Sequence, residues 1–214
     1  MSEPRMNTDE TRIGLQTDAV SLMALFCDKN KLAIPELRLT SLGDWKFDWV
    51  PAYYRPQYID ICTTKCSFPA APLRSRNWNW PGATTDKTPY GVIAHELGHH
   101  VDWTVSEVKW RYYGNFSKDL HAASGEPPIT DYEADKFWEW FAECFRLFLT
   151  NAALLKLLRP RTYALLRARF EPVSCESDWK SNLVGDPPER IVSNLQNKID
   201  KCSNRSPRRE LFTD

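Results

Sequence analysis

Two histidines and a glutamate in segment 95–99, which reads His-Glu-Leu-Gly-His, are the residues best placed to do chemistry. Apolar residues flank this segment on both sides and favour a buried helix. On a helix, residues four apart lie on the same face, so the imidazoles of His95 and His99 can bind one zinc ion. Glu96 then projects beside the metal, where a general base is needed. The pattern therefore predicts the kind of site that zinc hydrolases use.

A catalytic zinc site needs a third protein ligand. Only one histidine, His121, lies outside segment 95–100, and it falls in a stretch without periodicity. Glu139 and Glu143 are better candidates because they share one face of the next expected helix, which is otherwise rich in phenylalanine. Buried carboxylates need partners. One carboxylate could bind the zinc ion, and the other could accept a hydrogen bond from a ligand imidazole.

These segments resemble the family of anthrax lethal factor and the related Pro-Pro endopeptidases, which are zinc peptidases of the gluzincin type. The family's Glu-x-x-Ala-Glu motif is matched at residues 139–143, and Glu139 lies 40 residues after His99. The resemblance covers about residues 88–172. It implies that His95, His99 and Glu139 bind one catalytic zinc ion. It also implies that Tyr132, seven residues before Glu139, assists catalysis.

The resemblance further implies a zinc-dependent endopeptidase. Zinc would lower the pKa of a water molecule, and Glu96 would take its proton and pass one to the leaving amine. Zinc and the Tyr132 hydroxyl would stabilise the oxyanion. Glu143 or Asp102 could each orient a ligand imidazole. For Glu143, an ion pair with a basic neighbour such as Arg146 is the alternative.

Features outside these motifs bear on substrate binding. Trp78 and Trp80 precede the histidine helix and could line a substrate groove, although a hydrophobic loop anchor is an equal alternative. The edge of the sheet expected within residues 37–64 would pair with an extended protein or peptide substrate.

Composition limits the classes of partner. Lys+Arg and Asp+Glu both number 28 in the 214 residues, so the net charge is zero and nucleic acid is an unlikely partner. No apolar run reaches the roughly 18 residues that a membrane span needs. The polar N-terminus lacks a signal-peptide pattern, which makes the cytoplasm the default expectation, with secretion by a signal-less route as the alternative.

Because the N-terminus lacks a signal-peptide pattern, the six cysteines are expected to be reduced. Cys62 and Cys66 resemble half of a structural zinc site, which Cys175 and Cys202 could complete, but those two are isolated and far apart in the sequence. This second zinc site is the weaker interpretation.

Periodicity predicts an α+β fold, with a small mixed or antiparallel sheet packed on the active-site helix and a mainly helical C-terminal half, as in zincins. We expect a disordered N-terminus at 1–12 and a flexible tail at 202–214. Between them, residues 13–201 form one metallopeptidase domain, with a helix-plus-sheet part at 13–87 and a zinc-binding helical part at 88–172. The expected helices are 15–29, 88–110, 130–150 and 152–170 with a break near Pro160; the expected strands are 37–39, 45–49 and 58–62; and the expected irregular stretches are 67–89 and 113–130.

Two other functions compete with a peptidase. One is a catalytically silent zinc-bearing module for binding or assembly, against which the presence of Glu96 and Tyr132 argues. The other is a DNA-associated protease, but such enzymes usually have a third histidine ligand and a basic surface, which this chain does not offer.

Overall fold

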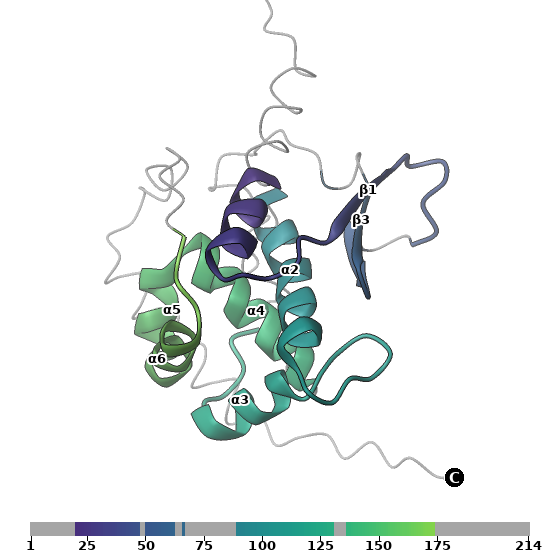
Figure 1. The fold of residues 1–214 in the computed structure, drawn as a ribbon. Helices are drawn as coiled ribbons and strands as arrows, with labels where there is room; N and C mark the ends of the chain where they lie inside the picture. The colour runs from purple at the N-terminus through teal and green to yellow at the C-terminus, as the bar shows by residue number, and fades with distance from the viewer. Residues whose placement is uncertain (1–19, 48–49, 63–65, 67–88, 131–135, 174–214) are drawn as a thin grey trace, which may run out of the picture.

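The structure is a computed structural model that describes residues 20–47, 50–62, 66, 89–130 and 136–173. Within these ranges it combines helices with one three-stranded sheet, which confirms the expected α+β class. The sheet lies on one side of the central helix α2, and the short helices α5 and α6 lie on the other side (Figure 1). The elements that carry the histidines therefore lie in the middle of the molecule.

The sheet is mixed. Its strands are β1 (Glu36–Thr40), β2 (Ala52–Arg55) and β3 (Tyr58–Cys62). Their order is β1-β3-β2, with β1 parallel and β2 antiparallel to β3. Burial alternates along β2, whereas β3 is buried without a break from Ile59 to Cys62, and α2 packs against β2.

Two of the expected strands are confirmed as β1 and β3, whereas the strand expected at 45–49 is wrong over the residues described there. Trp45 and Phe47 are not in a strand. Instead, Trp45 donates its indole N–H to the carbonyl of Val50 at 3.0 Å, and its ring lies 5.4 Å from the ring of Tyr53 in β2. The alternation of apolar residues therefore reflects aromatic rings that fold over β2. Strand β2 itself was missed from the sequence.

The helices follow the expected order with three corrections. The helix expected at 130–150 begins only at Phe137, because the backbone of Lys136 is extended. The histidine helix ends at Val105 rather than near residue 110, and a helix occupies part of the stretch 113–130 that was expected to be irregular. The expected break near Pro160 is confirmed, because Pro160 is the first residue of a new helix. Besides a helical segment at residues 20–29, the helices are α2 (Pro89–Val105), α3 (Phe116–Ser124), α4 (Phe137–Thr150), α5 (Ala152–Leu158) and α6 (Pro160–Arg169).

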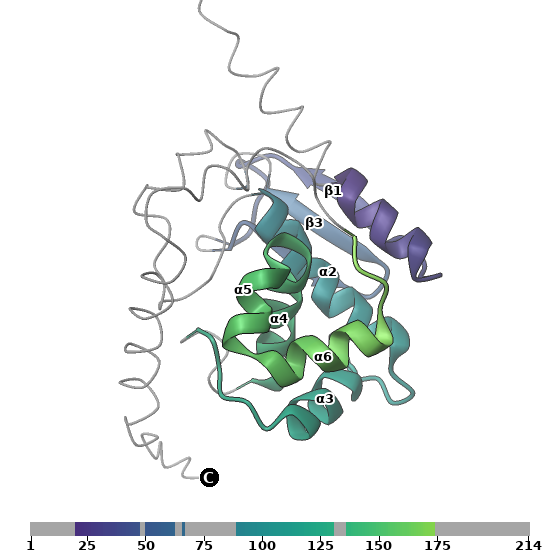
Figure 2. The same cartoon turned by 90° about the vertical axis from the view of Figure 1, so that its left-hand side faces the viewer.

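Helix α4 forms the centre of the core. All of its residues from 139 to 150 are buried, and it contacts α2, α3, α5 and α6. Figure 2 shows α5 and α6 on one side of α4 and the sheet on the far side. The phenylalanine stripe is a core feature, as expected: the ring of Phe145 lies 5.1 Å from that of Phe26 and 5.6 Å from that of Phe141. None of the described helices has both the length and the apolar character needed to cross a membrane.

A close crossing of α2 and α4 brings the two sequence motifs together. A Cβ atom on Gly98 would lie 2.9 Å from the Cα of Ala142 and 3.2 Å from the Cβ of Phe145. Such distances are too short, so the backbones approach this closely only because residue 98 has no side chain. The crossing sets His95 and His99 opposite the carboxylates of α4.

Candidate metal centre

Three buried side chains from α2 and α4 converge at this crossing. Each of His95, His99 and Glu139 offers one ligand atom, and the three atoms lie within 4.8 Å of one another. The Nε2 atoms of His95 and His99 lie 3.2 and 3.3 Å from the same carboxylate oxygen, Oε2 of Glu139. The helix spacing of four residues and the helix crossing together build this triad. The structure thus selects Glu139 rather than Glu143 as the carboxylate that faces both histidines.

The donor set of the triad fits a metal ion. Oε2 of Glu139 is buried and makes no hydrogen bond in the part of the chain that the structure describes, although two imidazole nitrogens face it. A buried acceptor without a hydrogen bond is costly in a folded protein. Two imidazole nitrogens and a carboxylate oxygen aimed at one point are a donor set that transition metals accept. The triad could therefore hold a metal ion.

The charges of the triad are strongly coupled. Burial opposes ionisation of Glu139, but the neighbouring imidazoles of His99 and His95 outweigh it and hold the carboxyl pKa far below its ordinary value. For His95, burial and the charge of Arg146 lower the pKa, yet Glu139 and Glu143 raise it more, to about 9. The two carboxylates thus favour the protonated form of the His95 imidazole, and a metal ion at Nε2 would compete with that proton.

Glu143 holds the outer side of His95. Its Oε1 lies 2.7 Å from Nδ1 of His95 and 3.0 Å from a guanidinium nitrogen of Arg146, and its side chain is fully buried. Both roles weighed from the sequence therefore occur together. When Nδ1 of His95 donates to Glu143, Nε2 is left facing the triad, which is the orientation a ligand imidazole needs.

Glu96 lies beside the triad on α2 and is buried, with 8% of its surface exposed. Burial raises its pKa above the ordinary value for a glutamate, while the nearby His95 and His99 act in the opposite direction. A carboxyl whose pKa is shifted towards neutral is a better proton carrier than an ordinary surface glutamate.

From the sequence, Asp102 was a candidate to orient a ligand imidazole, but its hydrogen bonds go to Gly114 and Ser117 instead. It is fully buried, and its carboxylate accepts hydrogen bonds from the backbone N–H groups of Gly114 and Ser117 at 2.8 and 2.7 Å, and from the Ser117 hydroxyl at 2.9 Å. These donors lie at the start of α3 and in the turn before it. Asp102 therefore anchors α3 to α2, and its two oxygens are used there rather than on a ligand imidazole.

The sequence did not indicate Tyr54, which covers the triad from the sheet. Tyr54 is buried in β2, and its ring stacks on that of His99 with centroids 6.5 Å apart. The adjacent tyrosines at 53 and 54, a residue type that is common in strands, are the signal that could have found it. The ring of His100 also contacts Tyr54, with centroids 5.7 Å apart, and its Nε2 is 2.7 Å from the carbonyl oxygen of Ala33.

Some of the remaining candidate residues are described by the structure, and others lie outside the described residues. His121 lies on α3 with its ring 4.7 Å from that of Trp140, outside the triad. Four cysteines are described, and all of them are buried: Cys27, Cys62, Cys66 and Cys144. Five residues with expected roles lie outside the described residues: Trp78, Trp80, Tyr132, Cys175 and Cys202.

Comparison of the chain with models of protein families, with curated proteins and with solved structures finds no match. The chemistry of the site is therefore read from its own geometry. His99 and Glu139 keep 8% and 9% of their surface exposed, whereas Glu143 and Asp102 keep none. His99 and Glu139 therefore keep a small exposed fraction, although Oε2 of Glu139 itself is buried.

Proposed function

We propose that this protein is a zinc-dependent endopeptidase with a zincin-like arrangement of its sheet and histidine helix. The observation that carries the proposal is the convergence of two Nε2 atoms, from His95 and His99, on one buried oxygen of Glu139. Of the metals that accept two imidazoles and one carboxylate, zinc is the one most used for hydrolysis at such sites. Three protein ligands leave a fourth position for water or substrate.

The residues around the triad support hydrolysis of a peptide bond. When bound, zinc would polarise the scissile carbonyl and make a water molecule more acidic. Glu96, whose pKa is raised by burial, would accept the proton of that water and deliver one to the leaving amine. Glu143 would hold the ring of His95 through Nδ1. The assistance expected from the hydroxyl of Tyr132 stays a prediction.

The sheet offers a place for the substrate chain. Strand β2 lies at the end of the strand order, so one of its edges has no partner strand among the described residues. Its residue Tyr54 stacks on His99. An extended peptide that pairs with this edge would therefore pass close to the triad.

Zinc content and peptide cleavage measured together test the proposal. We expect one zinc ion per chain in both the wild type and Glu96→Gln, and cleavage of a mixed-sequence peptide library, read by mass spectrometry, in the wild type alone. Glu107→Gln is a matched control, because Glu107 is exposed just beyond α2, and this variant should bind zinc and cleave like the wild type.

Two results would overturn the proposal. If the wild type and both variants bind zinc and none of the three cleaves a peptide, the protein is a silent zinc-bearing module. Absence of zinc from the wild type after chelation and re-addition of the metal would remove the basis of the proposal altogether.

A further inference from the structure

Three cations beside the metal centre are held by aromatic rings rather than by carboxylates. The guanidinium carbons of Arg55 and Arg111 lie 4.4 and 4.9 Å from the ring centroid of Tyr112. The ammonium nitrogen of Lys109 lies 4.4 Å from the ring centroid of Trp103. Arg55 comes from β2, and the other residues come from the end of α2 and the segment after it. We call these residues the cationic surface.

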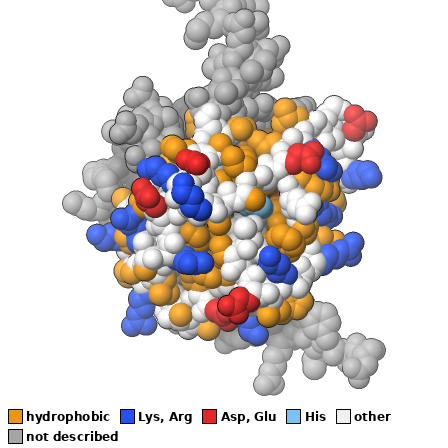
Figure 3. Space-filling view, in the orientation of Figure 1, with side chains coloured by type: hydrophobic (Ala, Val, Ile, Leu, Met, Phe, Trp, Pro, Cys, Tyr) orange, Lys and Arg blue, Asp and Glu red, His pale blue; other side chains and the backbone are white. Residues whose placement is uncertain are grey.

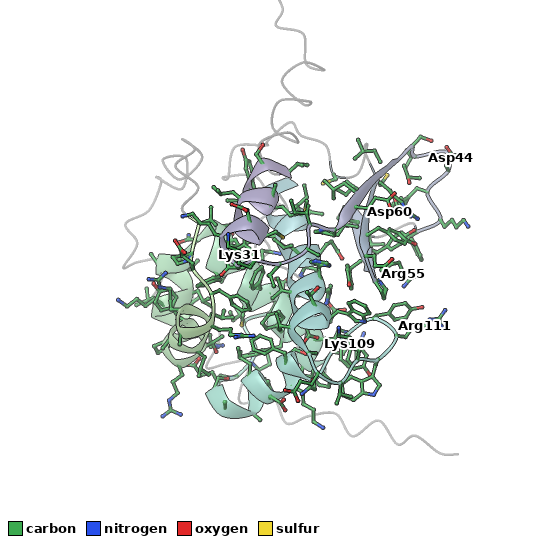
Figure 4. The ribbon with its side chains drawn as sticks, in the orientation of Figure 1. Lys31, Asp44, Arg55, Asp60, Lys109 and Arg111 are labelled. Carbon is green, nitrogen blue, oxygen red and sulfur yellow. The ribbon has the colours of Figure 1, made fainter. Side chains whose placement is uncertain are left out.

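No carboxylate of the described residues pairs with the cations of this surface. Among the described residues, Arg55, Lys109 and Arg111 form no ion pair, and Lys109 and Arg111 are exposed. The three side chains lie on the same side of the molecule (Figure 4), where basic and hydrophobic side chains are interspersed (Figure 3). A cation–π contact fixes the position of a cation without cancelling its charge. The surface is therefore prearranged to receive an anion.

The cationic surface is joined to the surroundings of the triad at two points of the chain. Arg55 follows Tyr54 in β2, and Tyr54 stacks on His99. On the other side, the residue after Tyr112, Tyr113, stacks on Trp138 with centroids 4.4 Å apart and rings nearly parallel at 6°. Trp138 directly precedes the ligand Glu139. Arg55 and Tyr112 are thus directly adjacent in the chain to residues that pack beside the triad.

We propose that the cationic surface binds an acidic segment of the polypeptide substrate, one in which aspartate or glutamate residues flank the bond that is cut. This inference rests on the proposed peptidase function. Arginine pairs with a carboxylate through two parallel N–H groups, and its rigid fork loses little freedom on doing so. The aromatic rings between the cations would pack against the aliphatic parts of the same segment.

Nucleic acid is the less suitable anion for this surface. Proteins that hold single strands offer open aromatic faces on which bases stack. Here Tyr112 already has two guanidinium groups over its ring, and Tyr113 is stacked against both Trp110 and Trp138. The net charge of the chain is zero, so no wider positive field would hold a long polyanion.

Binding can be measured without cleavage. The full chain carrying Glu96→Gln would be titrated against a fluorescein-labelled peptide of alternating glutamate and alanine, and against its glutamine counterpart, with anisotropy as the readout. We expect the acidic peptide to bind roughly 10-fold more tightly, and added salt to remove the difference. The assay needs neither zinc nor catalysis, so failure of the proposed function would show in the zinc and cleavage measurements instead.

Two variants in this background locate the binding site. Lys109→Glu with Arg111→Glu reverses two exposed charges, and we expect it to abolish the preference for the acidic peptide. Arg167→Glu with Arg169→Glu on α6 is the matched control and should leave binding unchanged. Circular dichroism checks that both variants fold, and Arg111→Gln alone, which removes one charge and reverses none, should weaken the acidic peptide by about 3-fold.

Three outcomes would overturn the inference. The first is equal binding of the acidic and glutamine peptides. The second is an equal effect of the α6 variant. The third is tighter binding of a labelled oligothymidine than of the acidic peptide, lost on reversal of Lys109 and Arg111, which would assign the surface to nucleic acid.

Discussion

Two buried carboxylates on neighbouring helices, Asp102 and Glu139, have opposite surroundings. Asp102 accepts three short hydrogen bonds from Gly114 and Ser117, and each of its oxygens has a donor. Oε2 of Glu139 makes no hydrogen bond among the described residues, although two imidazole nitrogens lie within 3.3 Å. Both oxygens of Asp102 are thus used to hold α3 on α2, whereas Oε2 of Glu139 has no such structural use among the described residues.

The difference teaches how a structural carboxylate can be told from a binding one. Both are buried and both are on helices with apolar surface, so burial alone does not separate them. What separates them is the type of partner: backbone donors at a helix start for Asp102, and imidazole nitrogens for Glu139. Four variants test this distinction.

The largest effect is expected when the binding carboxylate is removed. Glu139→Ala should weaken zinc binding by roughly 100-fold or more, because loss of a ligand should exceed the loss caused by a supporting partner. Competition with a zinc-sensitive dye measures the affinity. Glu107→Ala on the surface is the control, and zinc affinity unchanged in Glu139→Ala would place the metal elsewhere.

Removal of the structural carboxylate should act on stability instead. Asp102→Ala leaves the buried N–H groups of Gly114 and Ser117 without an acceptor, and we expect it to lower the free energy of unfolding by about 3 kcal/mol. Urea unfolding of the metal-free protein measures this. Asp119→Ala, at an exposed position of α3, should cost less than about 0.5 kcal/mol. A loss in Glu139→Ala as large as that in Asp102→Ala would erase the distinction.

A smaller effect on the metal is expected from the residue that supports His95. Glu143→Gln keeps the shape of the side chain but removes its charge, and zinc affinity should fall roughly 10-fold. The dye competition used for Glu139 reads this change as well. An affinity loss equal to that of Glu139→Ala would mean that Glu143 is itself a ligand.

The smallest effect concerns His100, which lies next to the triad but belongs to the fold. Burial lowers the pKa of His100 below its ordinary value, partly offset by its bond to the Ala33 carbonyl. The unfolded chain therefore takes up a proton below about pH 6.5 that the folded ring resists. The stability that His100 contributes is present above this pH and is lost as pH falls towards the folded pKa.

Unfolding in chelator at several pH values measures this contribution. The stability difference between the wild type and His100→Gln should shrink by up to about 1.4 kcal/mol per pH unit below pH 6.5. A difference that does not change with pH would show that His100 is not buried in its neutral form.

The sequence predicted the local features of the site well, because they depend on short spacing. The helix that carries His95 and His99, the buried α4, and the break at Pro160 all follow from periodicity and one proline. The grouping of Glu139 with the two histidines was expected from a resemblance in sequence, and the structure brings these three side chains together.

What the sequence did not predict depends on contacts between distant segments. Strand β2 is only four residues long, and the aromatic residues of Trp45–Phe47 imitate a strand because they pack over it. Helix α3 was missed although Gly125 provides a left-handed C-cap, because its start is capped from α2 by Asp102 rather than by a local side chain. The role of Asp102 as an anchor for α3 could not be predicted, because α3 itself was not predicted.

The close crossing at Gly98 also has a consequence for how relatives of this protein should be sought. The second variable position of the His-Glu-x-x-His motif cannot be free here, since any side chain at residue 98 would meet the backbone of Ala142. In proteins that share this architecture, the positions equivalent to Gly98 and Ala142 should therefore vary together and carry small residues. This paired constraint links the two motifs and gives a search pattern stricter than either motif alone.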